Sequence, residues 1–540
     1  MALLRKSLAK RMLACSVSAT MAFSMLTACT SKEGSGNEQT NAKDQGKTAA
    51  PAPAQQVTLK VEVFDRGNSP TGMTVTDNLM TKWVQQNFGD KNNIKLEYVP
   101  VPRAQEVDKL NVLMASGDAP DIVFTYDSNL VYKYAQQGGL TDLGKLIDEH
   151  GANLKSYLGA DTLANGKFDN VQYAIPAKRV YLGKYSSMIR QDWLDKLNLP
   201  VPKSTEEVYN TLKAFKEKKP GGDQTIPLGF GLFEASYEPI IYSFLKTNIS
   251  DEERFTLTQR FGSSDQPVTL PGHKDGVRFL NKLYNEGLMS PDFALDKDKK
   301  KLNQDVMAGK TGMYAEDAGT SYGIGANLEV LQKNVPGAKL TPIDPYTNDQ
   351  GKHAKPSYIP AGMFIMVPKS SKHAAEAVKY LNWMAQKENM YMMAFGVEGK
   401  NYKLENGIPT TIVSDDTKNL LYNFGDMLIV TNGIDFGDPE KNVAAQVTGL
   451  PEEQRKDAAI AKKNGLTDGI PQIRLPRPMQ SEVKYTKVLK DKYQELLVKA
   501  IIAKPADFDK VYDAALQDYM ANGGAEIAKE RKELYPQMKK

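Results

Sequence analysis

The pattern of apolar and polar residues is clearest between residues 110 and 127, where it predicts a helix, a turn and a strand. Apolar residues repeat there at helical spacing, and Gly117 supplies the left-handed residue that commonly ends a helix. The unbroken apolar run at 122–124 is typical of a parallel strand covered on both faces. In an open α/β sheet the ligand lies beyond the carboxyl ends of the strands, so we expect Tyr126 and Asp127 to face a cleft.

The preceding segment shows the same alternation of elements. Apolar residues alternate with polar ones at 57–63 and again at 94–98, as in half-buried strands. Between them lies an amphipathic helix, which we expect Thr76 or Asp77 to cap and Gly89 to end. Strands that alternate with helices over short connections predict a parallel sheet.

Later elements are predicted from shorter signals. A strand broken by Pro176 is expected at 172–179, and another strand at 364–367 is followed by an amphipathic helix. Ser204 and Glu207 have the spacing of a reciprocal capping box, which opens a helix. Helical periodicity then dominates the C-terminal part of the chain.

The N-terminus has the features of a removable signal. Residues 1–28 carry positive charges near their start and contain no acidic residue. Their apolar segment is too short for a confident membrane span. The segment ends in Leu26-Thr27-Ala28-Cys29, which resembles the bacterial lipobox, whose cysteine is diacylated and becomes the first mature residue. Secretory cleavage with Cys29 incidental is the alternative. Residues 31–56 lack large apolar side chains and predict a flexible tether.

Composition adds mainly exclusions. The chain has 540 residues, 41% hydrophobic and 25% charged, which is ordinary for two or three globular domains. Its net charge of +4 falls to zero without the four cations of the signal, so charge gives no case for nucleic-acid binding. Cys15 is lost with the signal and leaves Cys29 without a disulfide partner.

Known catalytic and metal motifs are incomplete in this sequence. The run Ala308-Gly309-Lys310-Thr311 lacks the first glycine of a phosphate-binding loop, and no G-x-S-x-G is present. The four histidines are scattered, so we expect no zinc site and no cofactor. Acidic residues are plentiful, and a glycosidase pair therefore remains an open alternative.

Several segments together resemble a known family. They are the lipobox, "SGDAPDIV", "YAIP" and "IRQDWLDKLNLPVPKSTEE", followed by "GKTGMY", "MVPKSSKHAAEAVKYLNWM" and "FGVEGKNY". In this order, the chain resembles an extracellular solute-binding lipoprotein of a carbohydrate ABC importer, of the family 1 type found on Gram-positive bacteria.

The resemblance implies a two-lobe α/β fold like that of periplasmic binding proteins, with a ligand cleft and several hinge crossings between the lobes. The expected division is signal 1–28, tether 29–56, first lobe 57–178 and 355–405, and second lobe 179–354 and 406–540. Alginate-binding relatives carry an acidic calcium loop, but here residues 220–225 contain one carboxylate, so we expect no calcium.

The resemblance also implies a function: a monomer anchored to the outer face of the cell membrane binds a sugar, expected to be an oligosaccharide, and delivers it to permease subunits. A surface-anchored polysaccharide-cleaving enzyme and a sensor for a membrane kinase are the alternatives. Strand ends and crossings supply the candidate ligand contacts, which are Asp65, Arg66, Tyr126, Asp127, Arg179, Tyr181, Phe230 and Glu316. For each of them, a surface ion pair or a place in the core is the competing interpretation.

Overall fold

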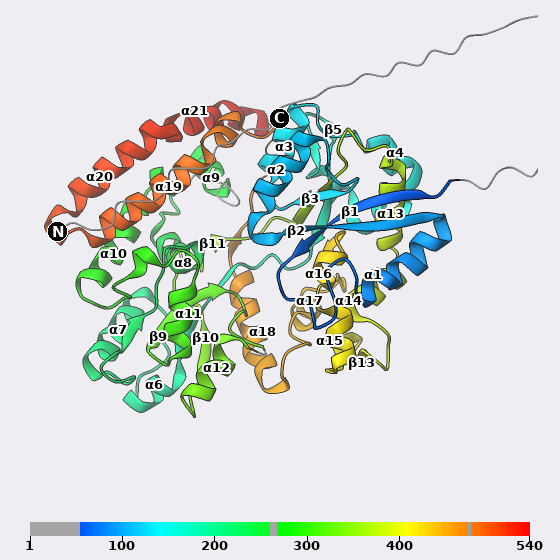
Figure 1. Cartoon of the computed structure of the whole chain (residues 1–540). Coiled ribbons are helices and arrows are strands. Elements are labelled where there is room, and N and C mark those ends of the chain that lie inside the picture. Colours follow the sequence, from blue (N-terminus) through cyan, green and yellow to red (C-terminus); the bar gives the residue numbers. More distant parts are fainter. Residues whose placement is uncertain (1–54, 260–266, 324, 474, 476, 540) are drawn as a thin grey trace, which may run out of the picture. The chain divides into compact units, whose positions relative to one another are not determined.

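The computed structural model describes residues 55–539, apart from 260–266, 324, 474 and 476 (Figure 1). The predicted signal, its lipobox with Cys29, and nearly all of the predicted tether therefore lie outside the described residues. Gln55–Lys540 form one compact unit. None of the described helices is long and apolar enough to cross a membrane.

The first sheet is built from the strands predicted near the N-terminus. β1 pairs with β2 in parallel, with Val57 opposite Ile94, and Ile122 joins β1 through a parallel bridge to Val61. The predicted parallel arrangement is thus confirmed. On the far side of β3 the sheet becomes mixed, in the order β15-β6-β12-β3. These strands are β1 (Val57–Asp65), β2 (Ile94–Pro102), β3 (Val123–Thr125), β6 (Ile175–Arg179), β12 (Ala361–Met366) and β15 (Thr431–Asn432).

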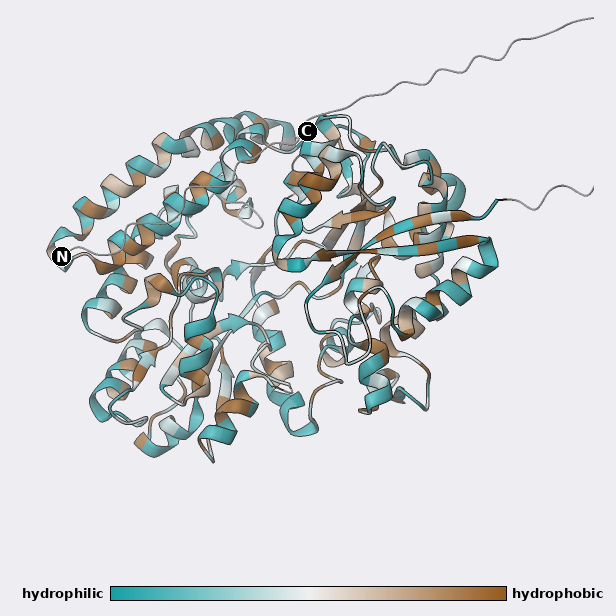
Figure 2. Cartoon of the chain, in the orientation of Figure 1, coloured by the Kyte–Doolittle hydropathy of each residue, from teal (hydrophilic) through white to brown (hydrophobic). Residues whose placement is uncertain are grey.

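Helices and strands of this part enclose two hydrophobic cores: one includes Phe64, Phe124 and Ile365, and the other includes Val123 and Met366. Figure 2 shows apolar residues gathered on the strands, with polar residues on the outer faces of the helices. The helices of this part are α1 (Leu79–Val84), α2 (Glu106–Ser116), α3 (Ser128–Gln136), α4 (Gly144–His150), α5 (Ala152–Ala164), α13 (Ala374–Met384), α14 (Lys387–Phe395), α15 (Asp415–Leu421) and α16 (Phe424–Met427).

The second sheet has the order β10-β7-β9-β8 and its own cores. Its strands are β7 (Tyr185–Arg190), β8 (Ile226–Leu228), β9 (Thr311–Asp317) and β10 (Leu340–Ile343). The helices on it, or on one another beside it, are α6 (Gln191–Leu197), α7 (Thr205–Lys218), α8 (Glu234–Phe244), α9 (Asp251–Thr258), α10 (His273–Asn285), α11 (Lys300–Met307), α12 (Asn327–Asn334), α18 (Glu452–Leu466), α19 (Gln480–Ile502), α20 (Phe508–Tyr519) and α21 (Ala525–Leu534). The helical C-terminal part is confirmed.

Short strand pairs and one further helix complete the architecture. The pairs are β4 (Lys167–Phe168) with β5 (Val171–Gln172), β11 (Lys355–Pro356) with β16 (Gly469–Ile470), and β13 (Tyr402–Glu405) with β14 (Ile408–Thr411). Helix α17 (Pro439–Ala445) contacts β14 and α18.

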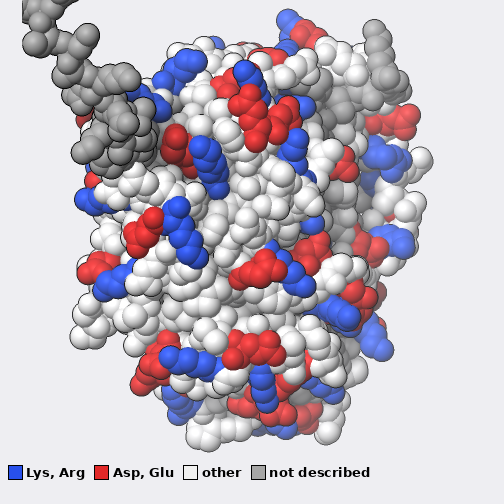
Figure 3. Space-filling model, turned by 90° about the vertical axis from the view of Figure 1, so that its right-hand side faces the viewer, with Lys and Arg blue, Asp and Glu red and all other residues white. Residues whose placement is uncertain are grey.

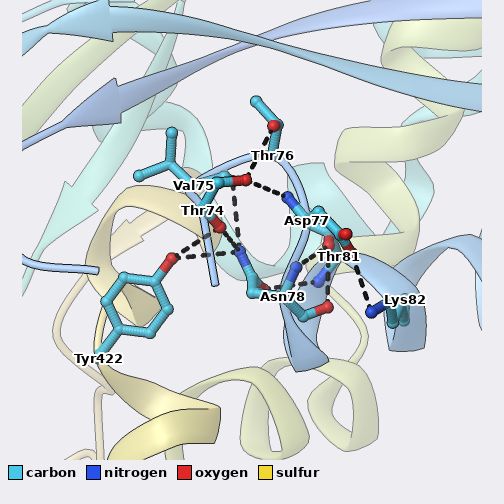
Figure 4. A network of polar contacts seen from close by, with 8 residues as sticks. All are labelled: Thr74, Val75, Thr76, Asp77, Asn78, Thr81, Lys82 and Tyr422. Atoms are coloured by element: carbon cyan, nitrogen blue, oxygen red, sulfur yellow. Dashed lines mark hydrogen bonds and ion pairs between the residues drawn. The ribbon is translucent and has the colours of Figure 1, made fainter. Parts of the chain in front are cut away.

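The start of α1 differs from the prediction. Asn78, rather than Thr76 or Asp77, is the N-cap: its side chain accepts from the Thr81 amide at 3.0 Å, while the Thr81 hydroxyl accepts from the Asn78 amide at 2.9 Å (Figure 4). The helical path also passes Gly89, and left-handed Asn93 follows its last turn. By contrast, Gly117 ends α2 with φ of 77°, as predicted.

The predicted capping box of α7 is only half formed. The Ser204 hydroxyl accepts from the Glu207 amide at 3.2 Å, but the Glu207 carboxylate accepts from Lys203, one residue before the cap. The helix still begins at the predicted position, because one satisfied amide and acidic first-turn residues are enough to stabilise its N-terminus.

Residues beyond 405, the expected end of the first lobe, also pack on the first sheet. Strand β15 pairs with β6, and Met427 to Ile434 lie in the core of the first sheet. Packing therefore places residues 406–434 with the first sheet, whereas α18 packs against β7 and β10 of the second.

Candidate functional site

The two sheets are joined where separate chain segments cross side by side. The first crossing, 180–184, leads from β6 to β7, and the second, 344–360, leads from β10 to β12. The Arg179 amide donates to the Pro360 carbonyl at 3.0 Å, and the Tyr358 amide donates to the Leu182 carbonyl at 2.9 Å. Backbone hydrogen bonds therefore hold the crossings together.

A third passage leads from β15 through α17 and α18. The Val180 amide donates to the Asn432 carbonyl at 3.2 Å, and the Lys184 amide donates to the Gly465 carbonyl at 3.3 Å. The first crossing is thus bonded to the chain at both ends of this passage.

At the first-sheet end, Tyr126 lies among arginines. Its ring centroid is 5.0 Å from the Arg103 guanidinium, and burial raises the pKa of its hydroxyl. Arg66 makes a bidentate pair with the buried Asp426, at 2.7 and 2.8 Å, and this hydrogen bonding raises the pKa of the arginine. Paired planar groups of this kind hold a fixed geometry. Asp426 is 360 positions from Arg66 and gave no signal in the sequence.

At the crossings, Arg179 and Tyr181 each meet a partner that the sequence did not reveal. The Arg179 guanidinium lies 4.3 Å from the centroid of the Tyr358 ring, and burial lowers its pKa. The Tyr181 hydroxyl donates to the Lys462 carbonyl at 2.8 Å, and the Lys462 ammonium lies 4.5 Å from the Tyr181 ring centroid. The fold therefore brings together cations and aromatic faces from both sheets.

Asp65 and Asp127 both have local structural partners. The Asp65 carboxylate accepts from the Gly67 amide at 2.9 Å. Asp127 caps α3, accepting from the Asn129 amide at 2.9 Å and the Leu130 amide at 3.4 Å. A cap of this kind accounts for an acid directly after a strand without any ligand.

Phe230 and Glu316 lie inside the second part of the fold. Phe230 is 2% exposed and meets Phe293 edge to face, with centroids 5.6 Å apart. Glu316 is 5% exposed, because the turn after β9 folds back over it: the Ser321 amide and hydroxyl donate to its carboxylate at 2.9 and 2.6 Å. Burial raises the pKa of this carboxyl to about 7. Both side chains take the core position that was their competing interpretation.

A cavity of about 670 Å³ adjoins the crossings on the side of β15. Four aromatic rings line it, and its polar lining includes amide and hydroxyl groups: the aromatic residues are Phe395, Tyr422, Phe424 and Phe436, and the polar ones include Asn432, Gln446 and Thr448. Asn432 also pairs in register with Arg179, which connects the cavity to the crossings. None of the eight candidates lines this cavity. Its residues were missed because β15 has two residues and the short helices around it leave little periodicity.

Charge on the outer surface is mixed. On the face drawn in Figure 3, acidic and basic side chains alternate without a large area of one sign. Among the described residues, no group of three or more histidine, cysteine, aspartate or glutamate side chains is arranged to hold a metal ion.

Residues 74–391 match the family model described as bacterial extracellular solute-binding protein. Lipoprotein LipO of Bacillus subtilis is 26% identical over 466 residues, covering 81% of this chain and 86% of that protein. The polygalacturonan/rhamnogalacturonan-binding protein YtcQ of the same species is 29% identical over 321 residues, covering 57% and 61%. Among solved structures, an EF-hand mutant of the Streptococcus pneumoniae ABC-transporter substrate-binding protein FusA, in complex with fructo-nystose, gives a TM-score of 0.63 at 16% identity, covering 89% and 99%.

The match spans more than half of the chain, so the protein belongs to the family of bacterial extracellular solute-binding proteins. The predicted family and the predicted two-lobe α/β fold are confirmed. Its class is that of a solute-binding protein.

Proposed function

We propose that this protein is the membrane-anchored, extracellular substrate-binding component of an ABC importer and captures an oligosaccharide between its lobes. The observation that carries the proposal is the meeting of Arg179, Tyr181 and Tyr358 on neighbouring crossings. Aromatic faces pack against the C–H side of a sugar ring, and guanidinium and amide groups bond to its hydroxyls. A ligand held there would touch side chains from both lobes.

The printed names of the relatives agree with a sugar ligand. YtcQ is named for binding polygalacturonan and rhamnogalacturonan, and FusA was solved with a fructooligosaccharide-type ligand, fructo-nystose. These ligands belong to those proteins, and they differ in charge, so they support the oligosaccharide class and leave its chemistry to be argued from this chain.

The proposed contacts are the aromatic and polar side chains at the crossings and the adjoining cavity. They are Arg66, Tyr126, Arg179, Tyr181, Tyr358, Asn432 and Gln446. Asp65 and Asp127 are proposed as contacts at the edge of the site. Their carboxylates, which accept hydrogen bonds from backbone amides, would also accept hydrogen bonds from the ligand. Phe230 and Glu316 are proposed to contribute indirectly, as buried residues that stabilise the second lobe.

Calorimetric titration of the mature protein against a panel of oligosaccharides tests the proposal. We expect binding of at least one member, and weakening by about 1–3 kcal/mol in Arg179→Ala, because a ligand group loses its buried donor. Chromatography of the sugar after long incubation should show no cleavage, and permease subunits should co-purify. Cleavage would favour the polysaccharide-degrading enzyme, and tight binding of peptides with no sugar bound would exclude the proposed ligand class.

The anchor is proposed on the Leu26-Thr27-Ala28-Cys29 motif and is tested separately. A single acyl chain binds membranes marginally, whereas two hold firmly, so the diacylated cysteine should decide the location. Cys29→Ser protein is expected in the culture medium, with Cys15→Ser still in the membrane fraction as the matched control. Retention of the Cys29→Ser protein in membranes would refute lipid anchoring.

A further inference from the structure

Buried cations in this protein generally have a carboxylate partner. Lys355 pairs with Asp344 at 2.5 Å, and Arg190 pairs with Asp192 at 2.6 Å. The pattern is expected, because removing a cation from water without compensation destabilises the folded state. A largely buried cation that lacks a carboxylate therefore indicates a place where the anion is to come from outside the chain.

Arg179 is one such cation. Its Nε atom donates to the Ala361 carbonyl over a long 3.5 Å, its flat face stacks on Tyr358, and within the described part of the chain no carboxylate forms an ion pair with it. Burial lowers its pKa, which is the sign of a charge that has lost water. Two nitrogens of the fork are thus available for a planar acceptor.

Lys462 is the second. Its ammonium lies over the Tyr181 ring, and its pKa too is lowered by burial. Asp317 is engaged by Lys299 at 2.5 Å, and Glu316 by the Ser321 groups. No described carboxylate lies within ion-pair distance of Lys462.

The position of Lys462 is fixed by its surroundings. Its carbonyl accepts the Tyr181 hydroxyl, and its stem passes over Gly319, where an added Cβ would approach the lysine Cε to 3.0 Å. Gly319 has φ of 87°, a conformation that suits glycine, so the chain leaves room for the lysine there.

The two cations come from opposite sides of the junction. Arg179 ends β6 of the first sheet, while Lys462 lies on α18, which packs on the second. Between them, Tyr181 and Tyr358 lie on crossings joined by the hydrogen bond from the Tyr358 amide to the Leu182 carbonyl. The arrangement is an aromatic platform with one unpaired cation at each end.

We propose that the ligand is a uronate-bearing oligosaccharide, whose sugar rings lie on Tyr181 and Tyr358 and whose carboxylates pair with Arg179 and Lys462. This inference rests on the proposed function and adds the charge of the ligand to it. A carboxylate matches the planar fork of Arg179 by two parallel hydrogen bonds, which a neutral hydroxyl does not. Pairing both cations would also link the two lobes.

The experiment compares ligands that differ only in charge. Trimers of galacturonate, glucuronate and mannuronate are titrated into the mature protein beside their methyl esters and the matching neutral trimers of galactose, glucose and mannose. At least one uronate trimer should bind about tenfold or more tightly than its ester and its neutral counterpart, as expected for charge-assisted hydrogen bonds. Its affinity should fall as salt is raised.

Two variants assign the effect to the proposed residues. Arg179→Gln and Lys462→Met should each weaken uronate binding about tenfold and weaken binding of the neutral trimer by a smaller factor, so that the preference for the uronate falls. Lys463→Met is the matched control, since Lys463 is exposed on the same helix and pairs with Glu440 at 2.5 Å. Thermal unfolding of all three checks that each folds.

The outcomes distinguish failure of the inference about ligand charge from failure of the proposed function. A neutral trimer that binds as tightly as its uronate, or uronate binding that is unaffected in both variants, would overturn the inference and leave the proposed function standing. Failure of every uronate, ester and neutral trimer to bind would count against both.

Discussion

At the scale of single residues, Glu62 is a buried carboxyl group whose hydrogen bonding is incomplete. It is 1% exposed on β1, and one carboxyl oxygen accepts from the Phe124 amide at 2.8 Å. The other oxygen has no hydrogen-bond partner in the described structure, and Glu106 lies close enough to oppose its charge. Burial raises the pKa of Glu62 to about 8. The carboxyl is therefore protonated in the folded protein at neutral pH.

Replacing this carboxyl should change how stability depends on pH. The folded pKa of about 8 lies above the reference value of 4.5, so the folded state holds a proton that the unfolded chain releases. That contribution is complete below about pH 4.5 and is lost as pH rises through about 8, on the order of 5 kcal/mol in all. Glu62→Gln keeps the acceptor for the Phe124 amide but cannot ionise, so its free energy of unfolding should fall less as pH rises.

Urea unfolding at pH 5, 7 and 9 measures this difference. Wild type should lose stability relative to Glu62→Gln at each step upward. As a matched control, Glu97→Gln changes an exposed acid on the neighbouring strand β2, and its stability should run parallel to wild type. Parallel curves for Glu62→Gln as well would mean that Glu62 is ionised in the folded protein.

Sequence reasoning placed four candidate residues at strand ends and crossings, but it missed the contacts that these residues make. Arg66, Tyr126, Arg179 and Tyr181 do lie at strand ends or crossings, as the rule for open sheets predicts. Their partners come from distant parts of the chain: Lys462 is 281 positions from Tyr181. Because such pairs arise only from the tertiary fold, a single sequence carries no local signal for them.

At the scale of elements, the periodicity of core-facing residues predicted the positions of helices and strands, whereas the residues that cap the helix ends were harder to predict. The run at 122–124 forms most of β3 and its bridge to β1 in the first sheet, and Gly117 ends α2 as expected. The true cap of α1 is Asn78, because its buried side chain also donates to the Thr74 carbonyl at 3.0 Å. Thr76 and Asp77 have cap-forming side chains too, and the choice among three adjacent candidates depends on the loop packed over them.

The cap of α1 should therefore matter to stability. Asn78→Ala removes the acceptor for Thr81 and the donor to Thr74 and to the Tyr422 hydroxyl, which lies 3.3 Å away (Figure 4). We expect a loss of about 2 kcal/mol in the free energy of unfolding, at the upper end for N-caps because the residue is buried. Chemical denaturation measures it.

Thr76→Ala provides the control for that measurement. Thr76 is exposed, and its hydroxyl meets only the Thr74 hydroxyl, at 3.1 Å, so its removal should change stability by less than about 0.5 kcal/mol. Equal losses in the two variants would show that the loop as a whole, and not the Asn78 cap, holds the start of α1.

At the scale of the whole described chain, connectivity was the hardest property to predict. Strand β15 has two residues, yet its pairing with β6 returns residues 406–434 to the first sheet before α18 joins the second. A two-residue strand shows neither alternation nor a long apolar run, so periodicity cannot mark it. The crossings at 180–184 and 344–360 each have one end marked in the sequence, since the first follows the strand expected at 172–179 and the second leads to the strand expected at 364–367.

Three passages between two sheets suit a binding protein that closes on its ligand. A ligand that touches both lobes stabilises the arrangement in which both contacts form, and the population shifts toward it. Small-angle scattering of a chain beginning at Gln55 should show a smaller radius of gyration when an oligosaccharide saturates it, approaching the value of about 23 Å typical of a compact chain of this length. Arg179→Ala, measured at the same sugar concentration, should show a smaller change in proportion to its lost occupancy. An unchanged radius at saturation, verified by calorimetry on the same sample, would indicate that the lobes form a rigid pocket instead.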